Sequence, residues 1–99
     1  MDRDAERSLR DAAAALDRKR NQVFAALAET ADAIAQTEEN SAHVHDDAAA
    51  YLPGASEHAA RSRRLAKAEK AAAAAFREHR VPPDDVRQVI RECGVRDQS

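Results

Sequence analysis

The chain has 99 residues, with 18 acidic and 16 basic side chains and a formal net charge of −2. This length allows one domain at most, spanning 1–99. The single cysteine, Cys93, excludes a disulfide within the chain. No run of about 18 apolar residues is present, and the N-terminus begins with alternating charges. We therefore expect no membrane association and a cytoplasmic protein, and leave open export by a route that reads no standard signal.

The composition favours an all-α fold. Alanine accounts for 25 residues, whereas Leu, Ile, Val and Phe together account for only 15. Alanine, arginine, glutamate and leucine all favour helices, and two glycines and three prolines leave room for few turns. The excess of Arg over Lys, 13 to 3, is typical of GC-rich bacterial genomes. We expect long helices that pack closely through small side chains.

The first helix is predicted over residues 2–51, because residues 2–50 contain neither proline nor glycine. Every seventh residue from Leu9 forms a heptad stripe that is apolar at both ends and polar in the middle, and Leu27, Ile34 and Ala48 lie close to it. The stripe comprises Leu9, Leu16, Val23, Thr30, Thr37, Val44 and Tyr51. Such a helix is about 73 Å long, so another element must pack along it.

A turn at 52–55 and a second helix at 56–80 follow. Pro53 disfavours the helical conformation at Leu52, Gly54 permits a turn, and Ser56 is a suitable N-cap. The second helix places Leu65, Ala68, Ala72, and Ala75 or Phe76 on one face, and its run of five alanines at 71–75 permits close approach of two helix backbones.

A Pro-Pro linker at 81–83 separates the second helix from a short amphipathic helix at 83–93. Asp84 and Asp85 occupy its first turn, where the helix dipole favours acidic side chains. The spacing of Val86, Val89, Ile90 and Cys93 gives it one apolar face. Gly94 followed by Val95 predicts a Schellman stop and a tail over 94–99, with Val95 against Ile90.

Charge is segregated along the chain in a way that predicts a helical hairpin. Residues 21–60 contain seven acids and no Lys or Arg, whereas residues 61–80 contain seven bases and two acids. Folding back at Pro53–Gly54 pairs residues whose numbers sum to about 107. This register sets Arg61 and Arg64 level with His43, Asp46 and Asp47, Lys67 with Glu38 and Glu39, and Arg77 with Glu29 and Asp32.

The same register leaves the start of the first helix uncovered, because the second helix reaches back only to about residue 27. The third helix is able to cover part of this length, and a second chain the rest. We therefore predict that a dimer with itself or a similar helical protein completes a four-helix bundle. The predicted partner-binding residues are Leu9, Leu16, Val23, Phe24, Val86, Val89 and Ile90.

Candidate chemical sites are weak. His43, Asp47 and His58 are possible metal ligands around the hairpin turn, but no standard metal-binding spacing supports them, and we read them as solvated polar residues. Cys93 reads as a small buried hydrophobe and His79 as ordinary charge near a helix C-terminus. We expect no metal, no cofactor, no small-molecule substrate and no enzymatic activity.

In its length and hairpin plan the chain resembles the WXG100 type of small exported helical hairpins, which act as dimers and as partner-binding export substrates. Where that family has Trp-x-Gly at the turn, this chain has Tyr51-Leu52-Pro53-Gly54, and it contains no tryptophan. The tail after the second helix also lacks the Tyr-x-x-x-Asp/Glu signal of that family.

The sequence thus predicts a coiled-coil-like antiparallel hairpin with a short C-terminal helix, acting as a non-enzymatic interaction module such as an adaptor or regulatory subunit. One alternative is a nucleic-acid-associated protein that uses the basic residues of 61–70, namely Arg61, Arg63, Arg64 and Lys67. We disfavour it because the chain is slightly acidic and has few aromatic residues among its basic ones. A second alternative is a WXG100-like exported hairpin.

Overall fold

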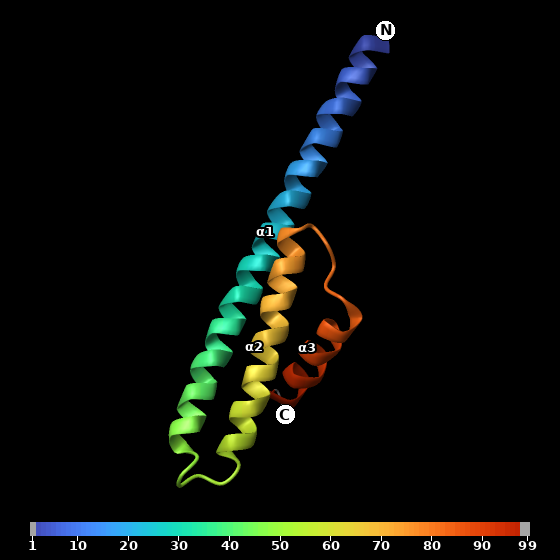
Figure 1. Ribbon diagram of the computed structural model, residues 1–99. Helices are drawn as coiled ribbons and strands as arrows, with labels where there is room; N and C mark the ends of the chain where they lie inside the picture. The colour runs from blue at the N-terminus through green and yellow to red at the C-terminus, as the bar shows by residue number, and fades with distance from the viewer. Residues whose placement is uncertain (1, 98–99) are drawn as a thin grey trace.

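The computed structural model describes the backbone of residues 2–97 and side chains as far as residue 94. It contains three helices, α1 (Asp2–Ala48), α2 (Ala55–Arg77) and α3 (Asp84–Asp97), and no strand within the described part. α1 and α2 form an antiparallel hairpin, and α3 returns along α2 (Figure 1). The all-helical prediction is confirmed, and so is the packing of a long first helix against the second.

Alanine forms the contact between α1 and α2. The buried residues of α1 are Ala28, Ala31, Ala35 and Ala42. Along α2, buried residues alternate in steps of four and three, through Ala55, Ala59, Ser62, Ala66, Glu69 and Ala73. This is the spacing of a heptad coiled coil, but its positions are filled by small side chains that permit close approach of the helix axes. We call these residues of both helices the alanine seam.

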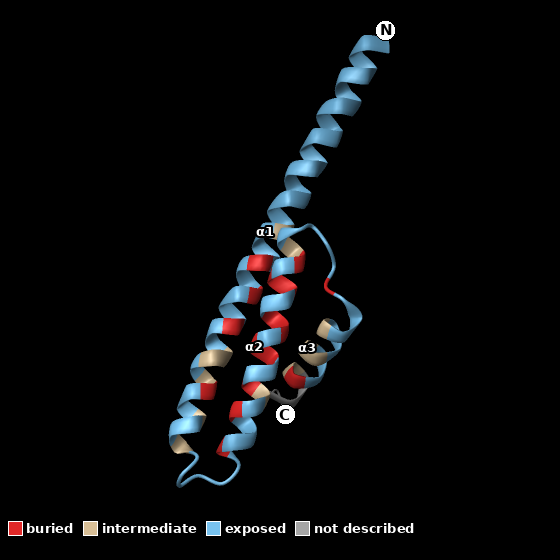
Figure 2. Ribbon diagram, viewed as in Figure 1, coloured by how far each residue is buried: buried red, intermediate tan, exposed pale blue. Residues whose placement is uncertain are grey.

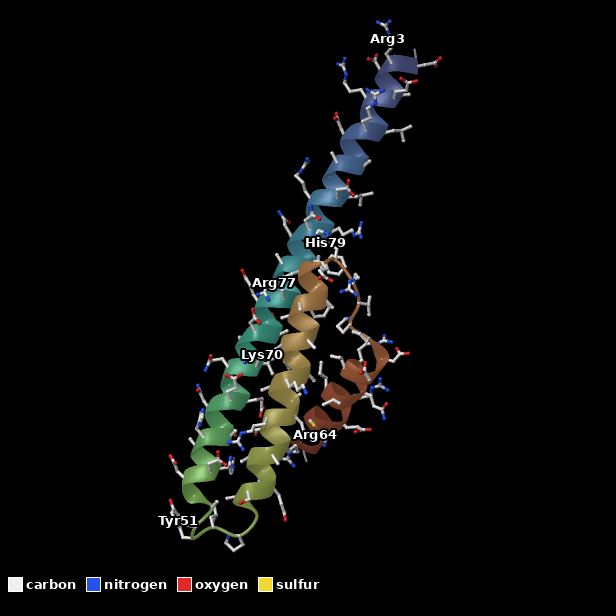
Figure 3. All side chains as sticks on the ribbon, viewed as in Figure 1. Arg3, Tyr51, Arg64, Lys70, Arg77 and His79 are labelled. Carbon is white, nitrogen blue, oxygen red and sulfur yellow. The ribbon has the colours of Figure 1, made fainter. Side chains whose placement is uncertain are left out.

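Three ion pairs run beside the alanine seam at intervals of seven residues. Arg63 pairs with Asp46, Lys70 with Glu39, and Arg77 with Asp32, so the residue numbers of each pair sum to 109. Figure 3 shows Lys70 and Arg77 on the side of α2 next to α1. The expected pairing of opposite charges across the hairpin is thus present. Arg77 pairs with Asp32 as predicted, and Arg63 and Lys70 pair with acids for which the predicted register had not placed them. We call these three contacts the ion-pair ladder.

The hairpin turn lies at residues 49–54, and Gly54 is its essential residue. Gly54 has φ 83°, a left-handed conformation that a Cβ makes costly. Gly54 is itself the N-cap of α2, and no side chain caps that end, so the predicted N-cap role of Ser56 is wrong. The carbonyl of Gly54 instead accepts the amide of His58 at 3.1 Å. α1 ends at Ala48, three residues before the predicted end, and the amides of Tyr51 and Leu52 in the turn both donate to the carbonyl of Ala48.

α2 ends in a Schellman motif that the sequence analysis did not find. The amide of Arg80 donates to the carbonyl of Ala75 at 2.9 Å, and the amide of His79 donates to that of Phe76 at 2.9 Å. His79 occupies the left-handed position of this motif, with φ 57°, where glycine is usual. α2 therefore stops at Arg77, three residues short of the predicted end.

α3 begins at Asp84, one residue after the predicted start, with Asp84 and Asp85 in its first turn as predicted. It continues through Gly94 to Asp97, so the predicted stop at Gly94 is wrong. Gly94 keeps a negative φ and has open space around it, so it does not adopt the left-handed conformation of a Schellman stop. The predicted contact of Val95 lies outside the described side chains. Cys93 is buried, as predicted.

The molecule is elongated, 76 Å long and 22 Å wide, because α1 extends far beyond the hairpin. Its accessible surface is 7387 Å². Compact monomers of the same 10.8 kDa mass expose about 5,500 Å², so this chain exposes roughly 1,800 Å² more than a compact monomer does.

Candidate helix-docking surface

The first half of α1 packs against no other described element. All residues from 2 to 23 are exposed, and Figure 2 shows this part of the helix projecting beyond the end of α2. We call residues 2–23 the N-terminal arm; at 1.5 Å per residue it is about 33 Å long. In proteins, most helix stability comes from packing of an apolar face, so an arm of this length without a partner is unusual.

Large apolar side chains lie along one face of α1, from the arm into the hairpin. Leu9, Leu16 and Val23 are 71%, 68% and 57% exposed, and Leu27 and Ile34 are 40% and 38% exposed. At about 100° per residue, these five positions fall within roughly 40° of one another around the helix. We call Leu9, Leu16, Val23, Leu27 and Ile34 the α1 stripe. It lies on a different face of α1 from the alanine seam.

An apolar groove of about 430 Å³ has as one wall the part of the α1 stripe that lies within the hairpin, Leu27 and Ile34. α2 forms its floor, and α3 with the preceding linker forms the other wall. Most of the polar lining is provided by Thr30, Glu69 and two arginines, Arg87 and Arg91. The full lining is Leu27, Thr30, Ala31, Ile34, Glu69, Ala72, Phe76, Val81, Pro82, Arg87, Ile90 and Arg91. We call this the α1–α3 groove.

Glu69 is a charged residue within the alanine seam. It is only 6% exposed and lies between the helices at the floor of the α1–α3 groove. Burial raises the pKa of the Glu69 carboxyl, and the nearby Glu38 carboxylate raises it further. Sequence reasoning assigned no role to this residue, although its place in the four-three spacing of α2 was available to find it.

Aromatic side chains pack together where the N-terminal arm joins the hairpin. The ring of Phe24 lies 5.1 Å from that of His79, stacked at an interplanar angle of 6°, and 6.4 Å from that of Phe76. The guanidinium of Arg20 lies over the Phe24 ring at 5.8 Å. Phe24 is therefore half-buried within its own chain, unlike the other predicted contact residues of α1. His79, labelled in Figure 3 where α2 ends beside α1, has a packing role that was not predicted.

The predicted contact residues of α3 are partly covered by α2. Val86 and Ile90 pack against the core cluster of Ala31, Ala72 and Ala73. Val89 lines a shallow surface hollow on the other side of α3, together with Arg64 and Lys67. α3 does not extend along the arm, because it runs from the end of α2 back toward the hairpin turn (Figure 1). α3 therefore leaves Leu9, Leu16 and Val23 exposed.

The candidate metal ligands do not gather. His58 stacks on His45 at 5.2 Å rather than meeting His43, and its Nδ1 accepts a hydrogen bond from Arg61 at 3.0 Å. His45 Nδ1 lies 2.8 Å from the Ser41 carbonyl, within hydrogen-bonding distance. Among the described side chains, those of residues 2–94, no three of His, Cys, Asp or Glu are placed to hold a metal ion together.

The basic residues of α2 divide between two faces. Arg63 belongs to the ion-pair ladder, while Arg64 and Lys67 lie beside α3, next to Asp85. Arg64 is labelled in Figure 3 near the far end of α3. Lys67 also lines a hollow with Arg63 and Lys70, so basic side chains extend from the ion-pair ladder to the side of α2 next to α3.

In the part of the chain that the structure describes, no helix has an apolar run long enough to cross a bilayer. Comparison with known proteins adds no assignment: no protein-family model matches the sequence, and neither curated proteins nor solved structures give a significant match.

Proposed function

We propose that this chain is a non-enzymatic protein–protein interaction module that acts through a helical-bundle dimer interface, with the N-terminal arm as its main contact surface. The observation that carries the proposal is the exposure of Leu9, Leu16 and Val23 on a helix face that no other described element covers. Soluble monomers rarely expose aligned large apolar side chains over such a length, and such surfaces mark interaction sites.

The size of the excess surface supports a dimer. Stable interfaces bury about 800 Å² on each partner, and obligate ones bury more. The roughly 1,800 Å² by which this chain exceeds a compact monomer is sufficient for such an interface. The alanine-rich core contains few large side chains, so association also supplies apolar burial that the single chain lacks.

The test is the solution mass of the wild type and of Leu16→Glu, measured by light scattering after gel filtration at tens of micromolar protein. We expect a wild-type dimer and a monomeric variant. Burying a leucine side chain contributes about 1.5–3 kcal/mol, and a symmetric dimer loses two, so Kd should weaken by about a hundredfold or more. Ala14→Glu is the matched control, because residue 14 lies on the opposite face of the same arm. A wild type that stays monomeric, or a dimer that both substitutions affect equally, would contradict the proposal.

A further inference from the structure

We propose that the occupant of the α1–α3 groove is the N-terminal arm of a second copy of this chain, lying antiparallel to α1, so that each chain inserts its arm into the groove of the other. This inference rests on the dimer proposed above and adds its partner and arrangement. It makes the groove, which α1, α2 and α3 surround on three sides, the place of the fourth helix of a bundle.

The first argument is continuity. The exposed leucines of the arm and the apolar wall of the groove belong to one stripe on one face of α1. Nine large apolar side chains are exposed among the described residues, and six of these belong to the α1 stripe or the groove. They are Leu9, Leu16, Val23, Leu27, Ile34 and Val81. A single antiparallel contact along this face covers both regions in both chains.

The second argument is spacing. Leu9 and Leu16 are separated by seven residues, and so are Leu27 and Ile34. In an antiparallel pair whose facing residue numbers sum to about 43, Leu9 lies level with Ile34 of the second copy, and Leu16 with its Leu27. Two-fold symmetry repeats both contacts. The arm side chains flanking these leucines include Ala12 and Ala13, which are small enough for close approach to the groove.

Disulfide trapping between two different single-cysteine proteins tests the arrangement. In a Cys93→Ala background, Leu9→Cys and Ile34→Cys proteins are prepared separately, mixed and oxidised. We expect a covalent dimer of twice 10.8 kDa in the mixture and no covalent dimer when either protein is oxidised alone. Positions 9 and 34 lie roughly 37 Å apart along α1, whereas a disulfide needs Cα atoms about 4–7 Å apart. A disulfide between positions 9 and 34 of two chains therefore requires the antiparallel arrangement.

The Leu16→Cys and Leu27→Cys pair provides a second, independent test of the same register and keeps it testable if a substitution at residue 34 disturbs the fold. Cross-linking of Leu9→Cys with itself would indicate a parallel dimer and overturn the arrangement. If light scattering shows a dimer that Leu16→Glu dissociates, but neither mixture cross-links, the reciprocal arrangement is refuted while the proposed function stands. A strictly monomeric wild type refutes both.

Discussion

The alanine seam leads to a sharp prediction about neighbouring residues within one run of five alanines. Ala73 is 0% exposed and faces α1 in the seam, whereas Ala74, the next residue, is exposed. Ala73→Leu adds three heavy atoms where two helices meet mainly through the methyl groups of alanines. Overpacking of this kind costs about 1–3 kcal/mol. Ala74→Leu makes the same chemical change on the surface and should alter stability by less than about 0.5 kcal/mol.

Urea unfolding followed by circular dichroism measures this difference. With a slope of about 1–3 kcal/mol per molar urea, a loss of 2 kcal/mol lowers the midpoint by roughly 1 M. Both variants are compared in a Leu16→Glu background, so that dimer dissociation does not contribute to the transition. Equal midpoints for Ala73→Leu and Ala74→Leu would refute the conclusion that alanine sets the distance between α1 and α2.

Two further predictions concern charges of the hairpin. Glu39→Lys should lower the free energy of unfolding by about 0.5–1 kcal/mol, because it replaces an ion pair of the ladder by repulsion from Lys70. Adding Lys70→Glu should recover most of this loss. Thermal unfolding at low salt measures both variants, and a double variant no more stable than the single one would count against the pair. Because the folded-state pKa of Glu69 is raised, its carboxyl favours folding at acidic pH, and this contribution disappears as pH rises through the folded-state pKa. Glu69→Gln should therefore be more stable than the wild type at pH 7, and this difference in stability should disappear toward about pH 4. Urea midpoints of both proteins across this pH range measure the difference. A difference that grows as the pH falls would contradict the prediction.

Much of the hairpin was predictable because its signals are local. Proline and glycine at 53–54 mark the turn, and Gly54 adopts the left-handed conformation that a tight turn favours. The segregation of acids and bases predicted that α1 and α2 pair in opposite directions. The partnership of Arg77 with Asp32 was predicted, whereas those of Arg63 with Asp46 and of Lys70 with Glu39 were not, because the numbers of each pair sum to 109 rather than to about 107.

The ends of α2 and α3 were harder to predict, and at the end of α2 a contact with α1 is involved. His79 takes the left-handed position at the end of α2, where it also stacks on Phe24, a residue 55 positions earlier. Gly94 is a usual stop signal, yet α3 continues through it to Asp97. Neither outcome follows from local propensity, which gives glycine the role that histidine takes here.

The heptad pattern of large residues in α1 did not predict which face of the helix packs against α2. The predicted stripe ran through every seventh residue from Leu9 to Tyr51, with Leu27 and Ile34 close to it, and the predicted register had α2 reach back along it to about residue 27. In the structure α2 instead packs on a neighbouring face made of alanines, because small side chains allow the helix axes to approach closely. The large residues are left exposed.

α1 therefore has two apolar faces with different roles. The alanine face packs within the chain and gives little apolar burial per residue, while the stripe of large side chains, which yields about 1.5–3 kcal/mol for each residue buried, packs against nothing along the arm. A chain that kept its largest side chains exposed would forgo its greatest source of stability. The contact with a second chain that we propose would recover it, and it would do so at Leu9 and Leu16 rather than at the histidines or the basic residues of α2.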